Sequence, residues 1–288
     1  MKKNTYPKVF AIVLNYNGND VLPLCLDSLY RSEYPNLEIV VVDNASKDGS
    51  LEDARKRFSR FHFIKNSKNI GFAAGNNVAI RFALEKMADY VFLLNNDATV
   101  DPDTIGKMVE EAEKDPSAGI FSPLILSPDG NVWFSGGKIL WLKMKTVHMP
   151  LSESNYSNRT DCVSGCAMLV KKAVFKKIGL FDEKFFLYYE DADFSLRAKR
   201  AGFDLKIIPS IFAHHAEKSE TENPAKLYWL VLSGLIFFKK NSSGLSKAWL
   251  CVHLRLRKFK NLLMVALRRS PASLEVRRAY QDYEKSLT

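Results

Sequence analysis

Three acidic side chains follow an aromatic run in the stretch FFLYYEDADFSLR, which covers residues 185–197. Glu190, Asp191 and Asp193 precede a predicted helix, and on a helix this spacing points the carboxylates in different directions. A carboxylate at a helix N-terminus is stabilised as an anion, whereas one pressed against a ring such as Tyr189 loses water and becomes more basic. The stretch therefore predicts either a general base in an apolar frame or an acid cluster that caps a surface helix.

A second candidate acid, Asp97, follows Asn95 and Asn96 at the end of the apolar run YVFLL. A carboxylate that leaves a buried strand beside amide side chains can bind a hard divalent cation, while waters or a diphosphate complete the coordination. The alternative is that Asp97 only caps the loop that follows. Asp97 is thus a candidate ligand for Mn²⁺ or Mg²⁺.

Two adjacent histidines, His214 and His215, end a predicted extended segment. Neighbouring residues of a strand point to opposite faces, so only one of the pair can serve a given site. A histidine at a strand end is usually a surface or packed residue. If Asp97 binds a metal ion, one imidazole becomes a plausible second ligand.

Four buried strands that alternate with helices position these side chains. The apolar runs predict strands at 9–14, 38–42, 61–64 and 90–94, and the alternation predicts an α/β fold with a mostly parallel sheet and helices on both faces. The carboxyl ends of such strands meet at one edge, where open α/β sheets bind ligands. Polar segments lie at this edge: NYNGND, DNASKDGS, NIGFAAGNN and NNDA.

Two common phosphate-binding motifs are missing from the chain. No G-x-G-x-x-G follows the first strand, and G-x-x-x-x-G-K-[ST] occurs nowhere. The sequence therefore argues against a dinucleotide-binding Rossmann domain and against a P-loop.

The middle of the chain is less regular. After a helix that ends near Lys114, PDG at 128–130, GG at 136–137 and the polar stretch SESNYSNRT at 152–160 predict hairpins and a mobile loop. The run CVSGCAMLV at 162–170 predicts a strand with Gly165 inside it, where a glycine often marks close approach of the backbone to a ligand. A further strand is predicted at 204–208.

Composition places the chain among ordinary globular proteins: 47% of its 288 residues are hydrophobic and 26% are charged. Its four cysteines show no paired framework, which favours a reducing compartment. The longest apolar run, 227–238, is shorter than the roughly 20 residues that span a bilayer, and Asn15 interrupts the first apolar stretch too early for a signal peptide. We therefore expect a cytoplasmic protein.

The net charge of +10 is concentrated toward the C-terminus. Helices are predicted at 223–240 and 245–269, and the second mixes apolar and basic residues. This pattern is typical of a helix on an anionic membrane surface, as on the inner face of a cell membrane, or of a core-packing helix with a solvated basic side. No nucleic-acid-binding motif accompanies the charge, so we expect no nucleic-acid partner.

Seven motifs, in order, resemble the inverting glycosyltransferases of family two with the GT-A fold, in particular the bacterial rhamnosyltransferase-like branch. The resemblance covers residues 8–220 and implies a glycosyltransferase domain at 1–220, with a nucleotide-sugar half at 1–100, an acceptor half at 101–220, and a basic helical tail at 221–288. The motifs are VLNYNG (13–18), VVDNASKDGS (41–50), NIGFAAGNN (69–77), LLNNDA (93–98), VSGCAMLVKK (163–172), FDEKFFLYYEDADFSLR (181–197) and HHAEKS (214–219).

On the donor side, the resemblance implies that Asp43 contacts the nucleobase of a nucleoside-diphosphate sugar and that Asn15 and Asn76 line the nucleotide pocket. Gly165 is added to this set because of its predicted close approach to a ligand.

For the chemistry, the resemblance implies that Asn95, Asn96 and Asp97 stand where the family places its metal-binding DXD-type motif, although Asn95 and Asn96 replace acids common elsewhere in the family. Asp191 would be the general base, with Glu190 as the alternative. His214 would contact the metal or the diphosphate, because its spacing to Ser219 matches H-x-x-G-x-S, apart from Glu217 at the glycine position.

These residues predict an inverting glycosyltransferase (EC 2.4 type) that moves a sugar from a dTDP- or UDP-sugar to a hydroxyl of a glycan or lipid-linked acceptor in cell-surface polysaccharide synthesis. The branch resemblance suggests rhamnose, and a UDP-linked hexose is the alternative. A nucleotidyltransferase or a non-catalytic nucleotide-sugar-binding protein are the competing classes.

Overall fold

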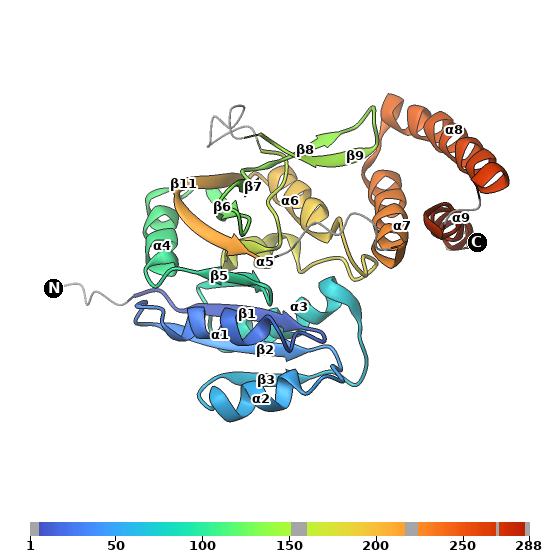
Figure 1. Ribbon diagram of the computed structural model, residues 1–288. Coiled ribbons are helices and arrows are strands. Elements are labelled where there is room, and N and C mark those ends of the chain that lie inside the picture. Colours follow the sequence, from blue (N-terminus) through green and yellow to red (C-terminus); the bar gives the residue numbers. More distant parts are fainter. Residues whose placement is uncertain (1–5, 151–159, 217–223, 269–270, 286–288) are drawn as a thin grey trace.

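A nine-stranded mixed sheet forms the centre of the molecule (Figure 1). The computed structural model describes residues 6–150, 160–216, 224–268 and 271–285. The strand order is β3-β2-β1-β4-β10-β6-β11-β5, and β7 pairs with β6. The strands are β1 (Val9–Asn15), β2 (Leu37–Asp43), β3 (His62–Lys65), β4 (Tyr90–Asn95), β5 (Ala98–Val100), β6 (Ala118–Leu126), β7 (Val132–Phe134), β10 (Ala167–Lys171) and β11 (Asp204–His215).

The four predicted N-terminal strands form the parallel part of this sheet. β1 lies between β2 and β4, in parallel with both, and β3 adds to β2. Three helices alternate with them, α1 (Leu22–Tyr30), α2 (Ser50–Arg57) and α3 (Gly71–Glu85). Six strands of the sheet, β1 to β4, β6 and β11, run in the same direction. The predicted mostly parallel α/β architecture is therefore confirmed.

Helices cover both faces of the parallel part. Leu14 of β1 packs on α3, where a side chain at Gly75 would lie 2.6 Å from it. The next residue, Asn15, donates a hydrogen bond to Ser50 at the start of α2. Because neighbouring residues of a strand point to opposite faces, α2 and α3 lie on opposite sides of the sheet.

The second half of the sheet differs from its prediction in two places. β10 begins at Ala167, so Gly165 lies in the turn before the strand and not inside it. The strand predicted at 204–208 and the extended segment that ends at the two histidines form one strand, β11, which pairs with β6 on both sides of an irregularity between Ile208 and Phe212 and with β5 along its other edge near His215.

Three helices support this second half: α4 (Thr104–Lys114), α5 (Lys172–Ile178) and α6 (Glu190–Arg200). Phe194 anchors α6 in the core, where its ring lies 4.8 Å from that of Phe181 and 5.5 Å from that of Phe175. A separate hairpin, β8 (Gly137–Leu140) with β9 (Lys145–His148), agrees with the predicted hairpin region. The predicted loop at 152–160 lies almost wholly outside the described residues.

Three C-terminal helices complete the fold: α7 (Pro224–Asn241) and α8 (Gly244–Arg268) pack beside the hairpin, and α9 (Pro271–Lys285) packs against α7 and α8 (Figure 1). Phe237 and Phe238 of α7 share a buried cluster with Trp141 of the hairpin and Tyr189 of the segment before α6. The third helix, α9, was not predicted. Among the described residues, no helix is long and apolar enough to cross a membrane. The predicted domain boundary at 220 falls outside the described residues and stays a prediction.

Candidate active site

Two adjoining cavities open at the carboxyl edge of β1 and β4. The larger cavity has a volume of 490 Å³ and reaches from Asp97 to Asp191, and the smaller cavity has a volume of 220 Å³ and lies beside Asn96. Both are lined by the same four residues at their junction: Phe72, Asn95, Asp97 and Leu187. A molecule with a diphosphate in its middle could therefore occupy both cavities at once.

An unusual backbone brings the acidic cluster to the larger cavity. Tyr188 and Tyr189 both adopt left-handed conformations, with φ of 69° and 66°. Such conformations are rare and strained for bulky residues and persist only where the surrounding structure enforces them. They turn the chain directly into α6, so that Glu190 and Asp191 occupy its first turn and line the cavity.

Asp191 is held in place by two backbone donors. Gly165 N–H donates to its Oδ2 at 3.0 Å, and Ala192 N–H donates to its Oδ1 at 2.7 Å. Burial raises the pKa of Asp191, while these hydrogen bonds and the charge of His148 act against that rise. The carboxylate is thus fixed in orientation and more basic than a free aspartate, as a general base requires.

Glu190 lies beside it in a more apolar setting. It is 5% exposed, and its Oε2 has no hydrogen-bond partner among the described residues. Burial, and next the charge of Asp191, raise the pKa of Glu190 well above its usual range. Two neighbouring acids in one apolar site cannot both be ionised at low cost, so the better hydrogen-bonded Asp191 carries the charge.

Asp97 and His215 form the second pair that faces the larger cavity. Asp97 Oδ1 lies 3.2 Å from His215 Nε2, yet the two atoms are not oriented to form a hydrogen bond, and both are buried without a partner among the described residues. Buried polar atoms without partners are rare and call for an explanation, such as an ion that the site binds. The carboxylate oxygen and the imidazole nitrogen suit Mn²⁺ or Mg²⁺.

The structure does not bring His214 to Asp97. Its side chain is exposed, and the residue pairs with Thr99 of β5, whereas His215 pairs with Ala98 and is 3% exposed. The alternation along β11 therefore selects the second histidine of the pair. The described residues contain no group of three or more His, Cys, Asp or Glu that could hold a metal, so a bound cation would take its other ligands from the substrate and water.

Only some of the residues predicted to bind the nucleotide line the smaller cavity. Asn95, Asn96 and Asp97 line the smaller cavity. Asn15 lies behind them, where it accepts a hydrogen bond from Asn96 at 3.1 Å and donates to Asp43 at 3.0 Å.

Glycine is required where this cluster is tightest. A side chain at Gly18 would lie 2.4 Å from both Asn15 Oδ1 and Asn96 Nδ2. The NYNG segment therefore needs Gly18 so that the two amides can meet.

Asp43 and Asn76 do not line either cavity. Asp43 is fully buried and accepts hydrogen bonds from Ser46 and Asn15, and Asn76 donates to Phe72 O within α3. Their place behind the cavity wall makes them supports of the site in this structure. The wall itself contains residues that were not singled out, all from the recognised motifs or the FFLYY run: Tyr16, Asn44, Asn69, Phe72 and Phe186.

Trp133 of β7 is another wall residue that sequence reasoning missed. Its ring lies 4.5 Å from the ring of His215 and 4.7 Å from that of His148, edge to face in both cases. No motif surrounds Trp133 in the sequence, so only the pairing of β7 with β6 brings it here. Its ring gives the larger cavity an apolar surface beside the candidate metal ligands.

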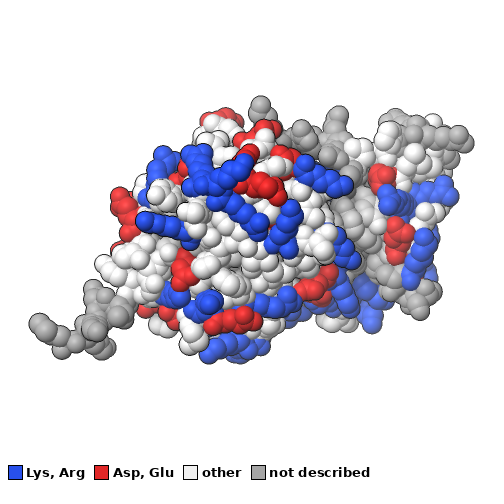
Figure 2. All heavy atoms as spheres, turned by 90° about the horizontal axis from the view of Figure 1, so that it is seen from below, with Lys and Arg blue, Asp and Glu red and all other residues white. Residues whose placement is uncertain are grey.

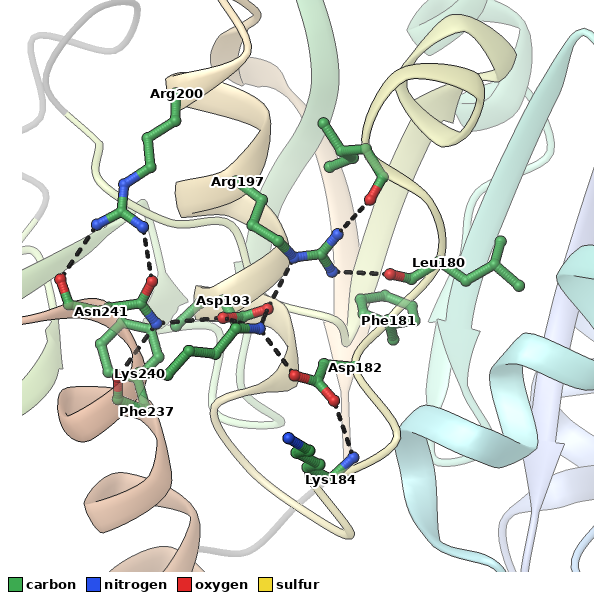
Figure 3. A network of polar contacts seen from close by, with 12 residues as sticks. Leu180, Phe181, Asp182, Lys184, Asp193, Arg197, Arg200, Phe237, Lys240 and Asn241 are labelled. Atoms are coloured by element: carbon green, nitrogen blue, oxygen red, sulfur yellow. Dashed lines mark hydrogen bonds and ion pairs between the residues drawn. The ribbon is translucent and has the colours of Figure 1, made fainter.

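The third acid, Asp193, lines neither cavity and lies in a buried polar network (Figure 3). It accepts hydrogen bonds from Arg197 at 2.8 Å, Lys240 at 2.8 Å and Asn241 at 3.2 Å. Arg200 also holds Asn241, at 2.8 Å. The network ties α6, which carries Asp191, to the C-terminal end of α7.

The chain is similar in sequence to known bacterial glycosyltransferases. The sequence is 28% identical over 241 residues to the N-acetylglucosaminyl-diphospho-decaprenol L-rhamnosyltransferase of Mycobacterium tuberculosis, covering 75% of this chain and 78% of that protein. It is 25% identical over 244 residues to the dTDP-rhamnosyl transferase RfbF of Shigella flexneri, covering 81% and 80%.

Solved structures show the same fold. The mannosyltransferase of Pyrobaculum calidifontis, solved with GDP-Man and Mn²⁺, is similar with a TM-score of 0.62 at 19% identity, over 98% of this chain and 83% of that one. The Staphylococcus aureus TarS fragment 1–349, solved with UDP-GlcNAc, is similar with a TM-score of 0.63 at 16% identity, over 98% and 82%. A sequence model of glycosyl transferase family 2 matches residues 10–179, more than half of the chain. The protein therefore belongs to glycosyl transferase family 2 and is a glycosyltransferase with the GT-A fold.

Proposed function

We propose that this glycosyltransferase moves a sugar, with inversion, from a pyrimidine nucleoside-diphosphate sugar to a hydroxyl of a glycan or lipid-linked acceptor in polysaccharide synthesis. The observation that carries the proposal is that one cavity is lined by a basic carboxylate, Asp191, and by Asp97 and His215. The facing oxygen of Asp97 and nitrogen of His215 have no hydrogen-bond partner among the described residues. Inverting transfer needs a proton acceptor on one side of the sugar and a stabilised leaving group on the other.

Each residue would have a separate role. Asp191 takes the proton of the acceptor hydroxyl as that oxygen attacks the anomeric carbon, and its hydrogen bonds to Gly165 and Ala192 keep the receiving oxygen oriented. Asp97 and His215 would hold Mn²⁺ or Mg²⁺, which when bound neutralises charge on the departing diphosphate. Asn95 and Asn96 line the adjoining nucleotide cavity.

The relatives favour rhamnose as the sugar and a dTDP-linked donor, because both proteins reported above are named as rhamnosyl transferases and the one from Shigella flexneri is named as a dTDP-rhamnosyl transferase. A UDP-linked hexose remains the alternative donor. The test is a thermal-shift panel of dTDP, UDP and GDP, each with and without Mn²⁺. We expect a rise of several degrees for one pyrimidine diphosphate, larger with metal, since a ligand of the folded state stabilises it by mass action. No shift with any diphosphate would contradict the proposal.

We also propose that the C-terminal region works at an anionic membrane surface. α8 packs inward through residues such as Leu250, yet its opposite side exposes an apolar strip with cations on both flanks, Arg255 and Lys260, and the helix contains no acid. On the face seen in Figure 2, by contrast, acidic side chains lie among the basic ones. The strip consists of Leu245, Trp249, Val252, Leu256, Phe259, Leu263 and Leu267.

Vesicle co-sedimentation tests this surface. The protein should pellet with vesicles that contain phosphatidylglycerol and not with pure phosphatidylcholine, and Leu256→Glu with Phe259→Glu should lower the bound fraction about tenfold. Leu274→Glu on α9 is the matched control, because Leu274 is also exposed but lies outside the strip. Equal binding by the strip variant and the control would contradict the membrane role.

A further inference from the structure

A second, apolar groove lies between the β8–β9 hairpin, α7 and α8. Its volume is 270 Å³, and most of its walls are aliphatic or aromatic. Leu227, Val231 and Phe238 of α7 form one side, Leu250 and Leu254 of α8 another. Nothing in the proposed transfer chemistry needs such a surface.

The groove adjoins the larger cavity. The two share Thr146, Tyr189 and Leu230 as wall residues, so the groove lies next to the cavity of Asp191. Tyr189 is one of the two tyrosines whose left-handed backbone turns the chain toward Glu190 and Asp191. A molecule in the groove would therefore touch the segment that carries the general base.

A glycine in the middle of α7 shapes this junction. A side chain at Gly234 would lie 3.2 Å from the ring of Tyr189. Glycine inside a helix lowers its stability by about 1 kcal/mol relative to alanine. A glycine at position 234 is nevertheless favourable, because it leaves space for the Tyr189 ring beside the groove.

The charges along the groove have one sign. Lys145 of the hairpin and Arg257 of α8 line it, both with exposed side chains, and no acid lies among the described residues of its walls. An apolar groove with two cations beside a sugar-transfer site matches a ligand that combines an apolar chain, a phosphate group and a sugar.

We propose that the groove binds the apolar chain of a lipid-diphosphate acceptor, with the phosphates beside Arg257 and Lys145 and the acceptor sugar in the cavity of Asp191. This inference rests on the proposed function and specifies its acceptor. A cavity of about 150 Å³ can hold one benzene, so 270 Å³ accommodates about ten carbon atoms of the chain nearest the phosphates. The rest of a longer chain would leave the groove beside α8.

Binding of farnesyl diphosphate and methyl diphosphate to the full-length protein, measured by calorimetry, tests the groove without any transfer reaction. We expect the farnesyl compound to bind about tenfold or more tightly, because each buried methylene adds to affinity. Leu227→Trp should fill the groove and abolish that preference, and Arg257→Glu should weaken both compounds. The matched controls are Leu142→Trp at the exposed hairpin tip and Lys247→Glu on α8, neither of which lines the groove.

The outcomes separate this inference from the proposed function. A farnesyl preference that persists in Leu227→Trp, or no preference in the unmodified protein, would overturn the groove assignment even if sugar transfer is observed. If Leu227→Trp removes the farnesyl preference but the unmodified protein transfers no sugar from any nucleotide donor, the groove assignment would stand and the proposed function would be wrong. Concentration-dependent dimerisation that blocks farnesyl binding would instead make a second copy of the chain the occupant.

Discussion

The two cavities of the active site are assembled in different ways. The smaller cavity takes most of its walls from the ends of adjacent parallel strands and the loops that follow them, and behind this wall Asn15 of β1 meets Asn96 after β4. The larger cavity combines distant elements, with Trp133 from β7, Asp191 from α6 and His215 from β11. Parallel strands bring short motifs together by topology alone, whereas the larger cavity depends on turns, register and the packing of the C-terminal helices.

The strongest test of this contrast is Asp191→Asn. Loss of the general base should lower the rate of transfer about 10³-fold, because a positioned base contributes roughly 10² to 10⁴, and the smaller cavity should still bind nucleotide with unchanged affinity. Steady-state turnover and nucleoside-diphosphate titration measure the two effects. Retained turnover would move the base to Glu190.

Asp193→Ala should remove the polar network that holds α6, and with it Asp191, against α7, although Asp193 itself lines neither cavity. Removing one partner from a buried ion pair leaves uncompensated charge and costs about 3 kcal/mol of unfolding free energy, here reduced somewhat because Lys240 is 34% exposed. Urea unfolding measures it. Asp53→Ala, which removes an exposed pair with Lys56, is the control and should change stability by less than about 0.5 kcal/mol. Equal losses in the two variants would mean that the network does not hold α6 to α7.

Asp97→Ala tests the junction of the cavities. If Asp97 and His215 hold a cation, this variant and His215→Ala should each weaken Mn²⁺-dependent binding of a nucleoside diphosphate about 30-fold, and metal-independent binding much less. His214→Ala is the matched control, because that side chain is exposed beside the pair. An equal effect of His214→Ala would contradict the geometric assignment, and unchanged affinity in Asp97→Ala would exclude the metal role.

The histidine pair also shows where sequence reasoning stops. Its spacing to Ser219 favoured His214, but register decides which side chain faces Asp97, and the register of β11 depends on an irregularity between Ile208 and Phe212 that no motif announces. Three of the four N-terminal strands were predictable because each contains a short, continuous apolar run, whereas the strand at 61–64 gave a weaker signal because His62 interrupts it. The role of Trp133 was not predictable, since a lone tryptophan in a three-residue strand gives no local signal. The assignment of residues 101–220 to acceptor binding stays a prediction.

The smallest effect is expected from Glu190→Gln. This variant tests the protonation state of Glu190, as distinct from that of Asp191, through the stability of the protein and not through the rate of transfer. The pKa of Glu190 is raised in the folded state, so the folded protein prefers the protonated acid, and the stability that this preference supplies is lost as pH rises from about 4.3 toward the folded-state pKa. A glutamine cannot ionise and avoids that loss. Near pH 4 the two proteins should therefore unfold at similar denaturant concentrations, and near pH 8 the variant should be more stable by about 1 kcal/mol or more. Chemical unfolding at several pH values measures the difference, and a gap that does not grow with pH would mean that Glu190 ionises in the folded protein as readily as it does in water.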